Sequence, residues 1–110
     1  MTIAEWLATR TPAPPPALMS RVREALGAGA DEDRALATDR CLDAAERIVA
    51  GLLRDGRVGR ESAPDLLTAD ALVTYAFEAA SDDVARLTDR ARDAMTRLAR
   101  LGTVAEARLG

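Results

Sequence analysis

The sequence predicts an all-α protein, a small helical bundle of four to five helices that forms a single domain over residues 1–110. Two observations support this class. The chain contains 24 alanines and 14 leucines, but only one Trp, one Tyr and one Phe. Closely packed helices use this composition, whereas sheets draw on β-branched and aromatic residues. Apolar residues also recur at alternating spacings of three and four, the period of an amphipathic helix.

A short amphipathic helix is predicted at the N-terminus, over residues 1–10. Thr2 and Glu5 form a T-x-x-E capping box, in which each side chain accepts a hydrogen bond from the other residue's backbone N–H. The Pro-rich linker TPAPPP at 11–16 ends this helix, because proline cannot continue a helix. One side of the helix carries three apolar residues: Ile3, Trp6 and Leu7.

Two further helices are expected before residue 55. Pro15 or Pro16 fits the first position of the helix through ALMSRVREAL, where a missing N–H costs nothing, and GAGA at 27–30 stops it. The next helix runs from about Asp33 to Arg54, with acids in its first turn. Its apolar stripe alternates spacings of three and four: Ala35, Thr38, Leu42, Ala45, Val49 and Leu52.

The segment LLTADALVTYAFEAAS at 66–81 is apolar on nearly every face. A helix of this kind is surrounded by neighbours, so we predict a central helix over about 65–80. Either the Trp6 helix or a dimer partner is expected to cover it. Ser62 and Asp65 offer a capping pair at its start.

A separate last helix is expected after the central one. Ser81 is predicted to cap it, and an apolar stripe follows from Val84 to Leu101. Gly102 is expected to stop it, because glycine is common just beyond helix ends. A T-x-x-E pattern at 103–106 suggests a short final helix.

Composition excludes several chemistries. The chain has no His and no Lys, so imidazole bases, Schiff bases and P-loop lysines are absent. Its 15 arginines are interleaved with 18 acids and the net charge is −3, which argues against nucleic-acid binding. No apolar run approaches about 20 residues and no signal peptide is evident, so we expect a cytoplasmic protein without membrane contact. The single cysteine, Cys41, is expected to be a buried structural thiol.

Three carboxylates, Asp39, Asp43 and Glu46, follow one another on one face of the 33–54 helix. Rows of this kind bind Mg²⁺ in some all-α nucleotide pyrophosphohydrolases, which makes a Mg²⁺-dependent hydrolase one hypothesis. Arg40 and Arg47 flank the row, so a solvated charged face is the competing interpretation. We assign no metal ligand, cofactor or catalytic residue from the sequence.

A thin polar stripe, Asp70, Thr74 and Glu78, interrupts the apolar 65–80 helix. Buried carboxylates need partners, so a seam that pairs them with arginines is one interpretation. The other is a pocket for a small apolar ligand, to which Tyr75 and Phe77 would also contribute. The sequence leaves both open.

The same segment resembles a helix of the trans-prenyltransferases. The match consists of LL, DAL and AFE within residues 66–81. Those enzymes hold Mg²⁺-diphosphate with D-D-x-x-D motifs, but here Asp82-Asp83 is followed by Val-Ala-Arg. The resemblance therefore carries no catalytic residue over to this chain.

These observations predict a non-catalytic helical interaction or regulatory module that forms a homodimer or docks a protein partner. Ile3, Trp6 and Leu7 are the candidate docking residues, because Trp is a common interface anchor, although packing over the protein's own core is the alternative. The rival function is a bundle that binds a small apolar ligand.

Overall fold

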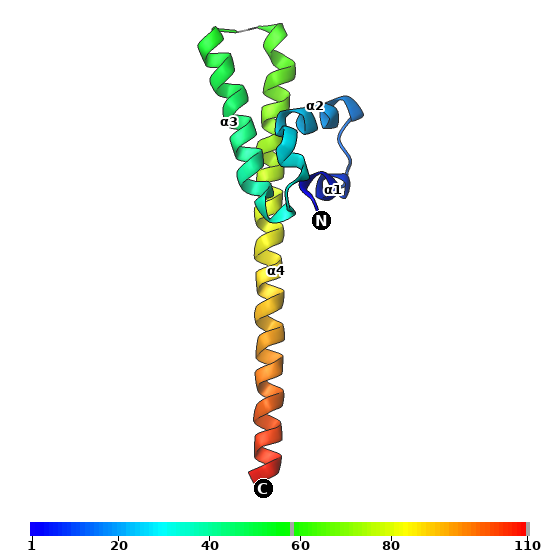
Figure 1. Cartoon of the computed structure of the whole chain (residues 1–110), viewed down its shortest axis with the longest axis vertical. Helices are drawn as coiled ribbons and strands as arrows, with labels where there is room; N and C mark the ends of the chain where they lie inside the picture. Colours follow the sequence, from blue (N-terminus) through cyan, green and yellow to red (C-terminus); the bar gives the residue numbers. More distant parts are fainter. Residues whose placement is uncertain (58, 110) are drawn as a thin grey trace. The chain divides into compact units, whose positions relative to one another are not determined.

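The computed structural model describes residues 1–57 and 59–109. It contains four α-helices: α1 (Ile3–Ala8), α2 (Pro16–Leu26), α3 (Ala37–Asp55) and α4 (Ala63–Leu109) (Figure 1). Short 3₁₀ turns cover Gly27–Asp31, Arg34–Leu36 and Arg60–Ser62. The all-α class predicted from the sequence is confirmed.

The chain divides into two compact units, Met1–Ala80 and Ser81–Gly110, which we call the first and second unit. The first unit holds α1, α2, α3 and the beginning of α4, and the second holds the rest of α4. The assignment of the whole chain to a single domain stays a prediction.

The N-terminal helix α1 begins with the predicted capping box. Thr2 Oγ1 accepts a hydrogen bond from the Glu5 N–H at 3.1 Å, and Glu5 Oε1 accepts one from the Thr2 N–H at 3.3 Å. The Ile3 N–H donates to the Glu32 carbonyl at 2.9 Å. These bonds fix the start of α1 against the segment that precedes α3.

The boundaries of α2 and α3 follow local chemistry. Pro16 occupies the first position of α2, as predicted. α3 starts at Ala37 rather than near Asp33, because Asp33 caps a 3₁₀ turn instead: its Oδ2 accepts from the Ala35 N–H at 2.9 Å. Gly56 ends α3 with φ 59°, a left-handed conformation that costs glycine little.

The core of the first unit lies between α1, α2, α3 and the beginning of α4. Figure 1 shows α3 and this part of α4 side by side. Small residues line the contact, and Thr38 Oγ1 on α3 donates to the backbone carbonyl of Ala76 on α4 at 3.2 Å. The buried face of α4 carries Ala69, Leu72, Tyr75, Ala76 and Ala79.

The predicted helix break at Ser81 is wrong, because α4 continues through it. A new helix would leave four N–H and four C=O groups without helical partners at each break and would need a new nucleus. Alanines precede Ser81 and good helix formers resume at Ala85, so the helix on either side supports continuation over a cap.

The predicted stop at Gly102 is also wrong. A glycine inside an exposed helix costs only about 1 kcal/mol relative to alanine, which the surrounding turns tolerate. Thr103 does not begin a new helix. Its Oγ1 donates back to the Ala99 carbonyl at 3.1 Å, as a threonine within a helix does.

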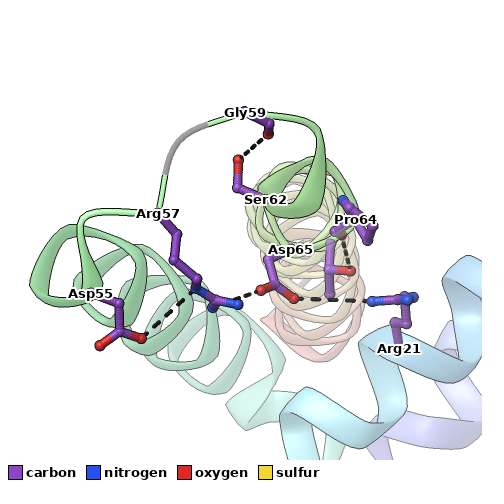
Figure 2. A network of polar contacts seen from close by, with 8 residues as sticks. Arg21, Asp55, Arg57, Gly59, Ser62, Pro64 and Asp65 are labelled. Carbon is purple, nitrogen blue, oxygen red and sulfur yellow. Dashed lines mark hydrogen bonds and ion pairs between the residues drawn. The ribbon is translucent and has the colours of Figure 1, made fainter.

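Ion pairs tie the α3–α4 connection together (Figure 2). Arg57 Nη2 donates to Asp65 Oδ2 at 3.0 Å, and its Nε lies 3.8 Å from Asp55 Oδ2. Arg21 on α2 lies 4.0 Å from the other oxygen of Asp65. Asp65 thus contacts arginines from α2 and from the connection after α3.

Ser62 and Asp65 do not act as the predicted capping pair. Ser62 is buried, and its Oγ donates to the Gly59 carbonyl at 2.7 Å within the 3₁₀ turn. The carboxylate of Asp65 is bonded to Arg57 instead. The ion pair between Asp65 and Arg57 therefore forms in place of the predicted capping contact.

Candidate functional site

An apolar groove runs along the outer side of α3 and the beginning of α4, both in the first unit. Its volume is about 700 Å³. We call it the α3–α4 groove. The residues that line it are Leu42, Ala45, Glu46, Val49, Ala50 and Leu53 from α3, and Leu66, Ala69, Asp70 and Val73 from α4.

The groove has a small-residue floor and bulky walls. Ala45 and Ala69 are buried at its base, whereas Leu53 and Leu66 on the walls are more than half exposed. On each wall the large residues recur at helical spacing, so they form two parallel apolar ridges. A concave surface of this kind fits the apolar face of a helix.

Two carboxylates, Glu46 and Asp70, interrupt the apolar lining, one on each helix. Neither makes an ion pair with another residue of the described chain. They are exposed, so water satisfies them in the isolated molecule. The groove thus combines apolar walls with two free negative charges.

The five candidate ligand residues do not converge on one site. Asp70 lines the groove, and Phe77, 69 % exposed, lies seven residues beyond it on the same face of α4. Tyr75 is buried on the opposite face. Thr74 Oγ1 donates to the Asp70 carbonyl at 3.0 Å, and Glu78 points to Arg10.

The expected pairing of the stripe carboxylates with arginines occurs at Glu78. Its Oε2 lies 3.7 Å from Arg10 Nη1, and the guanidinium of Arg10 lies 4.3 Å from the ring centroid of Trp6. Trp6 and Tyr75 contact edge to face at 6.4 Å. Burial and the nearby Glu78 charge raise the pKa of Tyr75, which keeps its hydroxyl neutral.

The candidate docking residues of α1 lie in the protein's own core. Ile3, Trp6 and Leu7 are each at most 2 % exposed. The Trp6 helix therefore covers part of the 65–80 segment, which is the first of the two arrangements expected from the sequence. These side chains offer no surface to a partner in this conformation.

The carboxylate row on α3 is dispersed. Asp39, Asp43 and Glu46 are all exposed, and Arg40 Nη1 lies 3.5 Å from Asp43. Arg40 also bonds Glu32 at 2.9 Å. Within the part of the chain that the structure describes, His, Cys, Asp and Glu side chains form no cluster of three suited to a metal ion.

The buried thiol predicted at Cys41 is confirmed. Its side chain is 0 % exposed, in the core where α3 faces α1, α2 and α4. Burial disfavours the thiolate and raises the pKa of Cys41 to about 11. A thiol in this state is a poor nucleophile at neutral pH.

The second unit presents one uncovered apolar face. The side chains of Val84, Leu87, Leu98 and Leu101 are each about two thirds exposed. With two alanines they form what we call the C-terminal stripe: Val84, Leu87, Ala91, Ala94, Leu98 and Leu101. The intervals alternate between three and four, the spacing of a coiled-coil seam.

Charged residues of the second unit pair along the same helix. Asp93 and Arg97, four residues apart, form an ion pair at 3.1 Å, and both side chains are exposed. Arg86 contacts Asp83, three residues before it. Exposed pairs of this kind add only a few tenths of a kcal/mol, so they do not replace the missing cover of the stripe.

The α3–α4 groove does not follow from the apolar stripes described above. Leu42 and Val49 belong to the predicted apolar stripe of α3, but both side chains are partly exposed and line the groove instead of the core. A signal was present: Leu42 and Val49 on α3, and Leu66 and Val73 on α4, are each seven residues apart. Matching seven-residue repeats on two adjacent helices predict a shared seam.

Comparison of the chain with protein-family models, curated proteins and solved structures gave no match. None of the helices, over the residues that the structure describes, has a stretch long and apolar enough to cross a membrane. The site must therefore be interpreted from its own geometry.

Proposed function

We propose that this protein is a non-catalytic helical interaction module that acts through self-association, most simply as a homodimer. The observation that carries the proposal is the pair of uncovered apolar surfaces, the α3–α4 groove and the C-terminal stripe. Extended apolar faces on small helical proteins mark association sites. The single thiol, Cys41, is buried and its raised pKa disfavours the thiolate at neutral pH, which is consistent with a non-catalytic module.

Burial of the apolar surfaces favours association. Full burial of a Val or Leu side chain gives about 1.5–3 kcal/mol, so the four large stripe residues, two thirds exposed, would give about 4–8 kcal/mol per copy. Association costs about 4–15 kcal/mol in lost freedom. The two stripes of a dimer would therefore give about 8–16 kcal/mol, which is comparable to that cost before burial of the two grooves is added.

Light scattering of the full chain across a concentration series tests the proposal. We expect a particle of twice 11.7 kDa at micromolar concentration and above. Circular dichroism on dilution gives a second readout, because an uncovered helix without tertiary contacts is only marginally stable in water. A monomer with concentration-independent helicity would overturn the proposal.

A second candidate function is binding of a small apolar ligand in the α3–α4 groove. Its volume of about 700 Å³ lies within the range of small-molecule sites, which is the observation that favours this function. Its open form and the scattered positions of Asp70, Tyr75 and Glu78 favour a helix as occupant instead. Native mass spectrometry of the purified protein would reveal a bound small molecule.

A further inference from the structure

We propose that the C-terminal stripe of one copy fills the α3–α4 groove of a second copy, and that the exchange is reciprocal. This inference rests on the proposed self-association and names the two surfaces that pair. Every copy carries both surfaces, so a reciprocal exchange between two copies covers both of them in a closed dimer.

The C-terminal stripe is longer than the groove that it would fill. The α3 wall runs from Leu42 to Leu53, about 17 Å at 1.5 Å per residue, and the stripe runs from Val84 to Leu101, about 26 Å. The stripe is therefore long enough to cover the whole groove. Alanines on the groove floor, Ala45 and Ala69, leave room for the leucines of an incoming helix.

The charges of the two units are complementary. Residues 1–80 hold 13 acids and nine arginines, a net charge of −4, whereas residues 81–110 hold five acids and six arginines, a net charge of +1. The free carboxylates of Glu46 and Asp70 lie in the groove itself. A basic helix is the occupant that these charges favour.

Two arginines flank the stripe on one side, where Asp83 also lies next to Val84 at the N-terminal end of the stripe. Arg90 and Arg97 each precede a stripe residue by one position, and Arg97 also contacts Asp93 of its own helix. On the other flank, the corresponding positions carry no charge: Thr88, Met95 and Gly102. Docked in the groove, this flank faces one of its two walls, so the arginines come within reach of the carboxylate on that wall.

Pairing of two stripes with each other satisfies these charges less well. In the antiparallel alignment that matches all six stripe positions, Arg90 faces Arg97 of the other copy, and like charges repel. In a parallel alignment the same arginines face Met95 and Gly102, and the groove stays empty. The groove pairing covers both apolar surfaces and provides the arginines with carboxylates.

Charge reversal in the full chain tests the pairing. One variant carries Glu46→Arg and Asp70→Arg in the groove, and the other carries Arg90→Glu and Arg97→Glu beside the stripe. Each alone should raise the dimer Kd at least about tenfold, because both reciprocal interfaces then hold like charges. Mixed together, the two variants should form a heterodimer of nearly wild-type affinity, since both interfaces become complementary again.

A matched control separates this effect from net charge. Arg92→Glu with Arg100→Glu makes the same charge change on the opposite face of the helix. It should leave the dimer Kd within about threefold of the wild-type value. Equal weakening by this control, or no weakening by the first two variants, would overturn the groove pairing while self-association stands. A wild-type chain that stays monomeric would overturn the proposed function itself.

Disulfide trapping identifies the contacting surfaces directly. A Val49→Cys chain and a Leu98→Cys chain, mixed and oxidised, should give a covalent heterodimer in preference to either homodimer. The buried Cys41 does not interfere. Predominant homodimers of the Leu98→Cys chain would mean that stripe pairs with stripe, and would overturn the inference.

Discussion

Leu72 and Leu98 are leucines on the same helix, but their surroundings differ completely. Leu72 is 0 % exposed and is among the largest fully buried side chains, whereas Leu98 is 61 % exposed. Leu72 belongs to a core cluster that also contains residues of α1, α2 and α3. Around Leu98, the second unit provides no neighbouring helix.

The first unit thus has a hydrophobic core of its own, whereas the second unit has only an exposed apolar face. The first unit buries Trp6, Tyr75 and Leu72 in one core cluster, in which Trp6 and Tyr75 contact edge to face. The second unit is stabilised by its backbone hydrogen bonds and exposed ion pairs, which are marginal in water. Its order should therefore depend on concentration, and that of the first unit should not.

The largest expected effect contrasts the two leucines directly. Leu72→Ala should lower the free energy of unfolding by about 3 kcal/mol, because it opens a cavity in a filled core. Leu98→Ala, the matched control, should cost under about 0.5 kcal/mol in dilute protein, where its side chain contacts mostly water. Urea unfolding of each variant measures the losses, followed by Trp6 fluorescence for the first unit and by circular dichroism for the helix of the second. Similar losses for the two variants would contradict the separation of the units.

An alkaline titration should destabilise the first unit through its buried thiol. The pKa of Cys41 is raised to about 11 by burial, whereas the unfolded thiol ionises near 9. The stabilisation is therefore complete below about pH 9 and is lost as the pH rises towards 11. Urea melts between pH 8 and 11 should show this fall, and Cys41→Ala should flatten it. Tyr75, whose pKa is raised too, adds a remaining slope above pH 10.

Loss of the capping box of α1 should lower the free energy of unfolding by an intermediate amount. Thr2→Ala removes the acceptor for the Glu5 N–H and should cost about 1 kcal/mol of unfolding free energy. Thr2→Ser keeps the hydroxyl and should restore most of it. If both variants are equally stable, the cap does not hold α1 in place.

Replacement of the two carboxylates of the polar stripe should have smaller and unequal effects on stability. Glu78→Gln breaks a half-exposed ion pair with Arg10, and a loss of about 0.5 kcal/mol is expected. Asp70→Asn should leave the stability of dilute protein nearly unchanged, since no ion pair with a described residue is lost. Thermal melts at low and high salt check this, because only the Glu78 effect should weaken with salt. A large loss for Asp70→Asn would indicate a buried partner.

The smallest effect is expected at the exposed pair of the second unit. Asp93→Asn removes its contact with Arg97 and should change the helicity of dilute protein by an amount equivalent to about 0.3 kcal/mol. Circular dichroism at low protein concentration measures this change. An effect above 1 kcal/mol would show that the pair has tertiary neighbours.

Local sequence chemistry predicted those parts of the fold that depend on a few neighbouring residues. The capping box at Thr2, the start of α2 at Pro16 and the burial of Cys41 were all confirmed. Each depends on interactions within a turn or on a simple apolar stripe. For the same reason, the all-α class followed from composition and period alone.

The helix ends at Ser81 and Gly102 were mispredicted because local signals compete there with helix propagation. Ser81 and Gly102 have the right residue types for a cap and a stop. Continuing an existing helix avoids new unpaired backbone groups, however, and that advantage accumulates over many residues rather than at one position. A single residue type therefore does not decide where α4 ends.

The sequence alone indicates that the 66–80 helix is apolar on nearly all sides, and that the helix of Trp6 has one apolar side that favours burial. The tertiary structure shows which side of this segment is covered. Residues of α1, α2 and α3 pack on one side, whereas Leu66, which lines the groove, and Phe77 stay exposed. The physical reason is that hydrophobic burial has no direction: a periodic pattern defines a face, but not the neighbour that covers it. Which faces remain open depends on how few helices a chain of 110 residues can supply.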